Sequence, residues 1–523
     1  MGHYASGDML ESTQSSSTKL AVLAAFKEHC SGERINTELA VVEGIRAIHP
    51  GKHVTTAAPR SVDLFGYAKA GHAEAKLIIT GDSYQSLRAY RARGSRMESG
   101  DGQLSDDVDF GHYEYKWNGE IFPMYHVAWV DETMGLQSFH YILSDREDGD
   151  AVHSVAADRL VIKCGKWSSE LHEEIYVFDN GHWQKNEDLW KAVQSASWDD
   201  VILDPAMKET LINDVHGFFD NRAVYEEVSV PWKRGIIMHG TPGCGKTISI
   251  KALMHSLQDK GVASLYVKSF DACQGLQYSI RSIFAHARVM APCLLLFEDL
   301  DSLVVDEVRS YFLNEVDGIE SNDGICMIGS TNHLERLDPG ISKRPSRFDR
   351  KYHYKLPGHQ ERILYCEYWR KKLAKRSDLG ITDEVCEIVA KLTESFSFAY
   401  MKELFVQALL AIVGGRDEDE DMTDASVSAA ADSVKVVEDS AKLAKDGEKT
   451  ESTADTTSGD SATEQTEKES KPARVPRKVP VVNVPEHLQS NAFLRVLRKQ
   501  IVALVKDMDD TDDEAAAPKP KIA

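Results

Sequence analysis

A glycine-rich loop between two regular segments constrains the fold of this chain most strongly. The segment Gly240–Thr247, with the sequence GTPGCGKT, fits the phosphate-binding pattern G-x-x-x-x-G-K-[ST]. It follows the apolar run Ile236–Met238 and precedes Ile248–Leu257, which has the composition of a helix. Glycines allow backbone N–H groups to turn inward around phosphate oxygens, and the following helix adds its positive N-terminal end. The strand–loop–helix order therefore predicts an α/β fold with a phosphate-binding loop.

Two side chains of this loop have predicted chemical roles. Lys246 can reach the β and γ phosphates of a nucleotide, and the Thr247 hydroxyl can bind Mg2+. A glycine-rich turn without a ligand is the alternative, but the flanking segments match what the phosphate-binding motif requires. The predicted nucleotide contacts in the loop are Gly240, Thr241, Pro242, Gly243, Cys244, Gly245, Lys246, Thr247 and Ile248.

A second apolar run ends in two acidic residues. Cys293–Phe297 is continuously apolar, which is typical of a buried parallel strand, and Glu298 and Asp299 follow it directly. Such a strand delivers polar groups at its carboxyl end, so we expect Glu298 to hold Mg2+ and Asp299 to polarise the attacking water. A core strand followed by an acidic turn is the alternative, which the phosphate-binding loop upstream disfavours.

A third apolar run precedes an amide and a basic segment. Ile325–Gly329 is followed by Asn332, which can hold a water molecule near the γ phosphate. Further along, Arg344–Arg350 has the sequence RPSRFDR. A guanidinium placed on the γ phosphate stabilises the charge of the transition state. A solvated basic turn is the alternative, but two of the arginines flank Phe348 in a fixed pattern.

The order of these segments resembles the AAA family of ATPases. The resemblance is carried by the phosphate loop, the acidic strand end, the Thr-Asn strand end and the RPSRFDR segment. It implies that Asn332 is the sensor-1 residue and that Arg347 and Arg350 are arginine fingers reaching the ATP of a neighbouring subunit. It also implies a homo-oligomeric ring, usually a hexamer, that binds ATP and Mg2+. The implied fold is a parallel sheet with helices on both faces and a small helical lid.

A narrower resemblance covers residues 198 to 409. The runs Trp198–Leu203 and Val230–Gly235 are similar to the AAA branch that includes the mitochondrial assembly chaperone of the cytochrome bc complex and its uncharacterised fungal relatives. By this resemblance, the backbone near Asp200 and Val201 contacts adenine. That chaperone has an N-terminal transmembrane helix, whereas we find no apolar run of spanning length in this sequence.

Three departures from the usual family pattern affect the functional prediction. Most AAA proteins end the acidic strand in Asp-Glu, whereas this chain has Glu298 before the shorter Asp299. The aromatic residue of the pore loop aligns with Ala272, which leaves Phe270 as either its substitute or a core residue. We find no sensor-2 arginine in the segment Phe396–Met401.

Composition favours an intracellular, soluble enzyme. A hydrophobic content of 42% is sufficient for large cores, and a net charge of −22 argues against a surface for nucleic acid. The eight cysteines form no C-x-x-C pair, which indicates a reducing compartment and not a disulfide or zinc framework. Because we see no secretory signal, we expect a cytoplasmic location, with the nucleus and the mitochondrion as alternatives.

Shifts in composition divide the chain into seven segments. The low-complexity stretch after the lid cannot bury enough apolar area to offset the entropy of ordering. The expected N-terminal strands are Ala75–Thr80, His112–Trp117, Phe122–Val130, Leu160–Cys164 and Glu174–Phe178. The predicted segments are a disordered start (1–17), an α+β or mostly β N-terminal domain (18–192), the large ATPase subdomain (193–357), the helical lid (358–413), a disordered acidic insertion (414–482), an amphipathic helix packing on the lid (483–508) and an acidic tail (509–523).

Together these features predict a ring that hydrolyses ATP with Mg2+ and remodels a protein client. Two alternatives remain open. The first is a nucleotide-gated assembly scaffold with little turnover, which the order of Glu298 and Asp299 and the missing pore aromatic motivate. The second is an ATPase that handles nucleic acid, which the net charge disfavours. The sequence does not identify the client.

Overall fold

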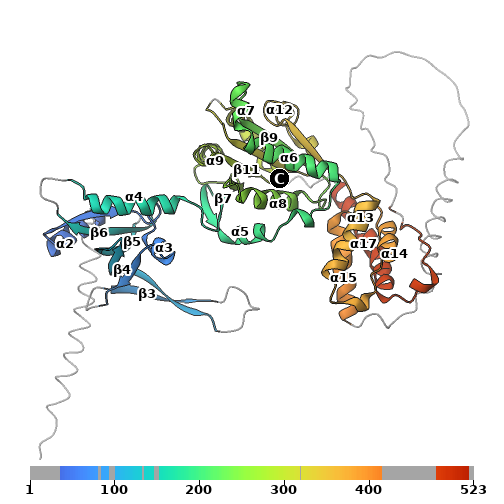
Figure 1. The fold of residues 1–523 in the computed structure, drawn as a ribbon, viewed down its shortest axis with the longest axis horizontal. Coiled ribbons are helices and arrows are strands. Elements are labelled where there is room, and N and C mark those ends of the chain that lie inside the picture. Colours follow the sequence, from blue (N-terminus) through green and yellow to red (C-terminus); the bar gives the residue numbers. More distant parts are fainter. Residues whose placement is uncertain are drawn as a thin grey trace, which may run out of the picture. The chain divides into compact units, whose positions relative to one another are not determined.

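The computed structural model describes residues 36–79, 84–92, 101–131, 135–146, 152–318, 320–414, 477 and 479–516. The chain divides into two compact units, Met1–His172 and Glu173–Ala523 (Figure 1). The predicted disordered start, 1–17, lies outside the described residues, as does nearly all of the predicted insertion, 414–482. Among the described helices, none has the length and hydropathy needed to cross a membrane.

The first unit is built on a six-stranded antiparallel sheet with the strand order β1-β6-β5-β4-β2, in which β3 also pairs with β4. Because side chains alternate between the faces of a strand, the sheet has two apolar faces. One is covered by α3 (Leu64–Lys69) and α4 (Val155–Ser169), and the other by α2 (Thr37–Ile48). The strands are β1 (Lys52–Ala57), β2 (Glu74–Leu77), β3 (Tyr84–Arg91), β4 (Gln103–Trp117), β5 (Glu120–Asp131) and β6 (Gly135–Asp145).

One predicted strand of this unit is wrong. Leu160–Cys164 lies inside helix α4, with Ser154 as its N-cap accepting a hydrogen bond from the backbone N–H of Ala157. Ala157, Leu160 and Cys164 are all fully buried. Their spacing of three and four residues is that of one helix face. The buried residues of this segment therefore follow the helix period and not the predicted strand period.

The second unit contains a seven-stranded sheet with the order β13-β9-β12-β11-β10-β7-β8. Its strands pair in parallel, except for the antiparallel hairpin of β7 and β8. This mostly parallel sheet confirms the predicted α/β fold. The strands are β7 (Ile175–Asp179), β8 (His182–Asn186), β9 (Lys233–Gly240), β10 (Ala263–Val267), β11 (Cys293–Phe297), β12 (Ile325–Thr331) and β13 (Arg350–Tyr354).

The boundary between the two units lies earlier in the chain than the predicted residue 192, because β7 belongs to the second sheet. We assigned this strand to the N-terminal domain, but Leu265–Val267 of β10 pairs in parallel with Tyr176–Phe178. The division between the units therefore falls after His172, and the segment up to residue 192 belongs with the second sheet. A hydrophobic strand pattern does not reveal which of two sheets a strand joins, because both offer an apolar partner.

Helices cover both faces of the second sheet. Strand β11 is completely buried; its Leu294 and Leu296 belong to the core shared with α6 and α8, whereas the ring of Phe297 contacts Phe284 of α9 and Phe312 of α11. This burial explains the continuous apolar run in the sequence. The helices are α5 (Glu187–Gln194), α6 (Pro205–Asp220), α7 (Arg222–Glu227), α8 (Lys246–Gln258), α9 (Leu276–Met290), α10 (Leu300–Leu303), α11 (Asp306–Asp317) and α12 (Pro339–Ser342).

A helical lid with its own core follows the sheet in sequence. It consists of α13 (His359–Lys372), α14 (Asp383–Leu392), α15 (Phe398–Val413) and α17 (Ala492–Ala516). The apolar face of α17 belongs to the same buried cluster as the other three helices. Helix α17 continues past residue 509, where we predicted the acidic tail to begin.

We predict that α17 contributes strongly to the stability of the lid. Phe493 is fully buried, and its ring lies 5.7 Å from that of Phe405 on α15. Phe493→Ala should lower the free energy of unfolding of the lid by about 3–5 kcal/mol, because it leaves a cavity. Denaturant titration of the full chain measures this change. Val502 lies on the same helix with 42% exposure, so Val502→Ala should cost less than about 1 kcal/mol. Equal effects of the two variants would contradict a buried interface.

Candidate functional site

The phosphate-binding loop connects the end of β9 to the start of α8. Gly245 has a φ of +103°, and α8 begins at the next residue, Lys246. At Gly240, φ is +139°, and an added Cβ would lie 2.1 Å from the carbonyl oxygen of Tyr354. Gly245 therefore requires glycine because of its backbone conformation, and Gly240 requires it because a side chain would have no space. Cys244 is buried, and this burial raises its thiol pKa to about 11, so the thiol stays protonated.

A cavity of about 440 Å3 lies over this loop. The structure brings most of the predicted site residues to its wall, and it adds six residues that were not predicted. The predicted residues that line it are Asp200, Pro242, Gly243, Gly245, Lys246, Thr247, Ile248, Glu298, Asp299 and Asn332. The added residues are Ile202, Ser330, Tyr365, Phe398, Ala399 and Lys402. Val201, Gly240, Thr241 and Cys244 are not among the lining residues, and neither are Arg347 and Arg350.

The ammonium group of Lys246 lies on the loop itself. Its Nζ donates hydrogen bonds to the carbonyl oxygens of Gly240 at 2.7 Å and Thr241 at 3.1 Å. Burial lowers the pKa of Lys246, while the nearby carboxylates of Asp299 and Asp301 act in the opposite direction. Phosphate oxygens can replace the two carbonyls as acceptors, because they are stronger and carry charge. The lysine is thus held where a nucleotide phosphate would bind.

The two acidic residues after β11 differ in their surroundings. One oxygen of Glu298, Oε2, accepts a hydrogen bond of 2.8 Å from the Tyr266 hydroxyl, while Oε1 is buried without a partner in the described part of the chain. Asp299 has a left-handed backbone with φ of +51°, and its N–H donates to the Ser330 Oγ at 3.3 Å. Such a conformation is unfavourable for aspartate and is found most often at functional sites.

A second buried acceptor without a partner lies at the end of β12. Asn332 Oδ1 forms no hydrogen bond to the described residues, although the neighbouring Thr331 hydroxyl donates to Asp301 at 2.6 Å. Buried oxygens of this kind need a donor, such as a water molecule or a hydrated cation. The two orphaned oxygens, on Glu298 and Asn332, therefore fit a site for hydrated Mg2+ and a water molecule.

A turn and the lid also contribute residues to the cavity wall. Asp200 and Ile202 line it, while Val201 between them is buried and its carbonyl accepts a hydrogen bond from Lys208 Nζ at 3.1 Å. Two lid residues, Tyr365 and Phe398, also line the cavity, with ring centroids 5.2 Å apart. A flat base fits between an apolar turn and aromatic rings.

A lid cation also reaches the cavity. Lys402 lies on the first turns of α15 and lines the cavity wall. Lys402 directly follows Phe396–Met401, the segment in which the family resemblance places a sensor-2 arginine. Its place in the sequence could therefore have identified it as a site residue.

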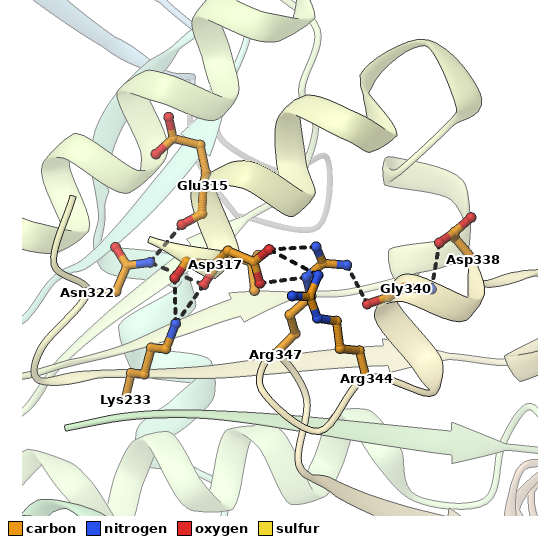
Figure 2. A network of polar contacts seen from close by, with 9 residues as sticks. Lys233, Glu315, Asp317, Asn322, Asp338, Gly340, Arg344 and Arg347 are labelled. Carbon is orange, nitrogen blue, oxygen red and sulfur yellow. Dashed lines mark hydrogen bonds and ion pairs between the residues drawn. The ribbon is translucent and has the colours of Figure 1, made fainter. Parts of the chain in front are cut away.

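The predicted arginine finger Arg347 is held by its own chain, as Figure 2 shows. Its Nε and Nη2 donate to the two carboxylate oxygens of Asp317 at 2.7 and 2.6 Å, and Nη1 donates to the Gly340 carbonyl at 2.8 Å. Arg347 is only 7% exposed. Lys233 in turn donates to the carbonyl of Asp317, at the end of α11. A buried guanidinium with three hydrogen bonds is costly to move.

The second predicted finger is more accessible. Arg350 begins β13, its side chain is 52% exposed, and its Nε forms one ion pair with Asp214 at 3.0 Å. The structure does not bring either arginine to the cavity of its own chain.

Phe270 is a core residue. It is 3% exposed, and its ring lies 6.3 Å from that of Phe297 and 6.1 Å from that of Phe312. Of the two interpretations that the sequence left open, the structure supports the core residue, so Phe270 is not available as a pore-loop aromatic.

The fold and the cavity together define a P-loop nucleotide-binding domain: a parallel sheet, a glycine-rich loop that opens a helix, and acidic residues at a neighbouring strand end. Residues 236–356 match the family model of the "ATPase family associated with various cellular activities (AAA)". These residues therefore match an AAA ATPase domain, in agreement with the resemblance seen in the sequence.

Curated relatives share this part of the chain. The sequence is 28% identical over 236 residues to the ribosome biogenesis ATPase RIX7 of Saccharomyces cerevisiae, covering 41% of this chain and 28% of that protein. It is 31% identical over 230 residues to an ATP-dependent zinc metalloprotease YME1 homolog of Schistosoma mansoni, covering 41% and 33%. It is 27% identical over 232 residues to a putative cell division cycle ATPase of Plasmodium falciparum, covering 42% and 18%.

The matched region thus spans a third or less of these relatives. None of the three is named as an assembly chaperone of the cytochrome bc complex, so the narrower resemblance stays a proposal.

We predict that the contact between Asp317 and Arg347 makes stability depend on pH. The Arg347 guanidinium holds the pKa of Asp317 below its usual value. The contact therefore stabilises the folded chain above the pKa of an unfolded aspartate, about 4, and this stabilisation is lost as the pH falls through the lower folded-state pKa. The melting temperature of Asp317→Asn should be below that of wild type at neutral pH, and the difference should shrink below about pH 4.

Thermal unfolding between neutral and acidic pH tests this prediction. Asp306→Asn is the control, because the Asp306 carboxylate is 91% exposed in its ion pair with Arg309 and contributes little. A difference between wild type and Asp317→Asn that stays constant down to about pH 2 would be evidence against a stabilising charge pair.

Proposed function

We propose that this chain is a Mg2+-dependent ATPase that acts as a ring, a hexamer by its family resemblance, and that it remodels a protein client. The observation that carries the proposal is the cavity wall: phosphate loop, Glu298, Asp299 and Asn332 line one space, while Arg347 and Arg350 do not. Such a site can bind a nucleoside triphosphate by itself but lacks an arginine on the γ phosphate.

The loop and the acidic strand end would bind the phosphates. Lys246 would exchange its two carbonyl acceptors for β and γ phosphate oxygens. Thr247 and Glu298 would hold Mg2+, which neutralises part of the phosphate charge when bound. The Glu298 oxygen without a partner is the atom that such binding would satisfy. Tyr365 and Phe398 would pack against adenine, with Asp200 contributing backbone. Val201, the other residue expected at adenine, would support this turn through its hydrogen bond from Lys208.

Two side chains would orient the attacking water. Asp299 would accept a hydrogen bond from the water and polarise it, and Asn332 Oδ1 would accept a second one. Two fixed acceptors would restrict the position of this water beside the γ phosphate.

A neighbouring subunit would complete the site. Arg350 is the better placed finger, because it is half exposed and has a single ion pair to exchange. Arg347 would remain on Asp317 and support the segment that carries Arg350, or would reach the neighbour only after that contact breaks. A shared site requires a ring or another closed assembly.

We predict that activity rises steeply with protein concentration, because each complete site needs two subunits. Lys246→Ala and Arg350→Ala should each reduce steady-state ATP hydrolysis at least about 100-fold, since each removes a contact with the γ phosphate. Arg222 is an exposed arginine paired with Glu226, so Arg222→Ala is the matched control and should behave like wild type.

Mixing the two inactive variants provides a stricter test. Each lacks a different half of the shared site, so some sites in a mixed assembly are intact and part of the activity should return. If the mixture stays inactive although both variants assemble, the arginine does not act between subunits.

A nucleotide-gated scaffold with little turnover is the second candidate. The observation that favours it is the acidic pair: Asp299, one methylene shorter than glutamate, stands at the water-activating position. Asp299→Asn separates the two functions. For an ATPase we expect turnover to fall at least about 100-fold while nucleotide binding stays unchanged. Turnover that is already at the level of Lys246→Ala in wild type, and unaffected by Asp299→Asn, would favour the scaffold.

The client, the branch and the location are proposed from the sequence. The resemblance to the bc complex assembly branch motivates a protein client, and the acidic net charge favours it over nucleic acid. We propose a cytoplasmic location because the eight cysteines form no C-x-x-C pair and fit a reducing compartment.

A further inference from the structure

A tyrosine on the neighbouring strand contacts the carboxylate that we expect to hold Mg2+. Tyr266 lies on β10 in register with Leu296 of β11, and Glu298 follows the end of β11. The Tyr266 hydroxyl donates a 2.8 Å hydrogen bond to Glu298 Oε2. Glu298 lines the cavity, but Tyr266 is not among its lining residues. The tyrosine therefore acts on the carboxylate and not on a ligand.

This hydrogen bond makes the two oxygens of Glu298 unequal. Oε2 has the hydroxyl as its donor, whereas Oε1 is buried and has no partner in the part of the chain that the structure describes. A carboxylate oxygen that is buried without a donor is unfavourable unless a ligand supplies one. The hydrogen bond from Tyr266 thus leaves Oε1 of Glu298 as the oxygen that can contact a cation or its water molecules.

The length of the Glu298 side chain explains why a hydrogen bond from Tyr266 would assist metal binding. A glutamate has one more rotatable bond than an aspartate, so fixing it for metal binding costs more conformational entropy. Groups behind a metal ligand offset this cost by holding the ligand in its binding orientation. Most AAA proteins, the family that this chain resembles, have an aspartate at the position of Glu298, which is one methylene shorter.

We propose that Tyr266 is a positioning residue, which holds Glu298 so that Oε1 is presented to the Mg2+ bound with the nucleotide. The inference rests on the proposed function, because it presupposes that Glu298 binds Mg2+. It adds a requirement to that function: a long carboxylate and a tyrosine act together where most AAA proteins have a short carboxylate.

The test is a Mg2+ titration of nucleotide binding with the full chain. A fluorescent, slowly hydrolysed ATP analogue is bound in EDTA and then with increasing Mg2+, so the readout does not depend on turnover. Tyr266→Phe removes only the hydroxyl and keeps the ring. We expect it to raise the Mg2+ concentration for half-saturation about tenfold. The affinity for the analogue in EDTA should be unchanged, because the tyrosine does not line the cavity.

Two further variants separate positioning from a general structural effect. Tyr354 is a buried tyrosine on β13 of the same sheet whose hydroxyl donates to the Met238 sulfur, so Tyr354→Phe removes a comparable hydroxyl away from Glu298. Its Mg2+ dependence should equal that of wild type. Glu298→Asp shortens the carboxylate out of reach of the hydroxyl. In that background, adding Tyr266→Phe should change the half-saturation less than twofold, because the hydrogen bond is already absent.

The outcomes distinguish this inference from the proposed function. A tenfold shift for Tyr266→Phe that disappears in the Glu298→Asp background supports positioning. The inference is overturned by an unchanged half-saturation, by an equal shift in both backgrounds, or by a loss of binding in EDTA together with a lower melting temperature. If wild-type binding shows no Mg2+ dependence at all, the proposed function fails first, whatever Tyr266→Phe does.

Discussion

The parallel pairing of β9, β11 and β12 determines where the polar groups of the nucleotide site lie. Parallel strands end at the same edge of a sheet, so the phosphate loop after β9, the acids after β11 and Asn332 after β12 meet there without long side chains. The pairing depends on burial from both faces, and every residue of β11 is inaccessible to solvent. The chemistry of the site is thus a consequence of how the sheet is packed.

Buried polar groups lack partners in the cavity but have them around Arg347. In the cavity, oxygens of Glu298 and Asn332 are left without donors, a cost that a bound ligand can remove. Around Arg347 the opposite holds, because the guanidinium and Asp317 satisfy each other within one chain (Figure 2). A group that acts on a neighbouring subunit must exchange its partners, and the more exposed Arg350 can do so at lower cost.

The sequence predicted the core of the site because its motifs are local. Glu298 directly follows an apolar run, Asn332 comes three residues after the end of one, and Lys246 comes eight residues after the end of one, inside the glycine-rich loop. Such short spacings can be recognised without knowledge of the fold. Contacts between distant segments were not predictable in this way. Tyr266 precedes Glu298 by 32 residues, and the two meet only because β10 and β11 are neighbours. The prediction of a strand at Leu160–Cys164 is wrong for a different reason, because so short a segment, with four apolar residues and one lysine, fits either the strand or the helix period.

The position of α17 in the chain has a consequence for biosynthesis. The core of the lid contains residues of α13, α14 and α15, yet Phe493, Leu497 and Ile501 of α17 are just as deeply buried in it. A chain emerging from the ribosome therefore displays the apolar face of α15 until the residues after position 492 have been made. During this interval the sheet can be complete while the lid is not. Chaperones that bind exposed apolar helices would meet this protein at that stage, after its nucleotide-binding loop has already formed.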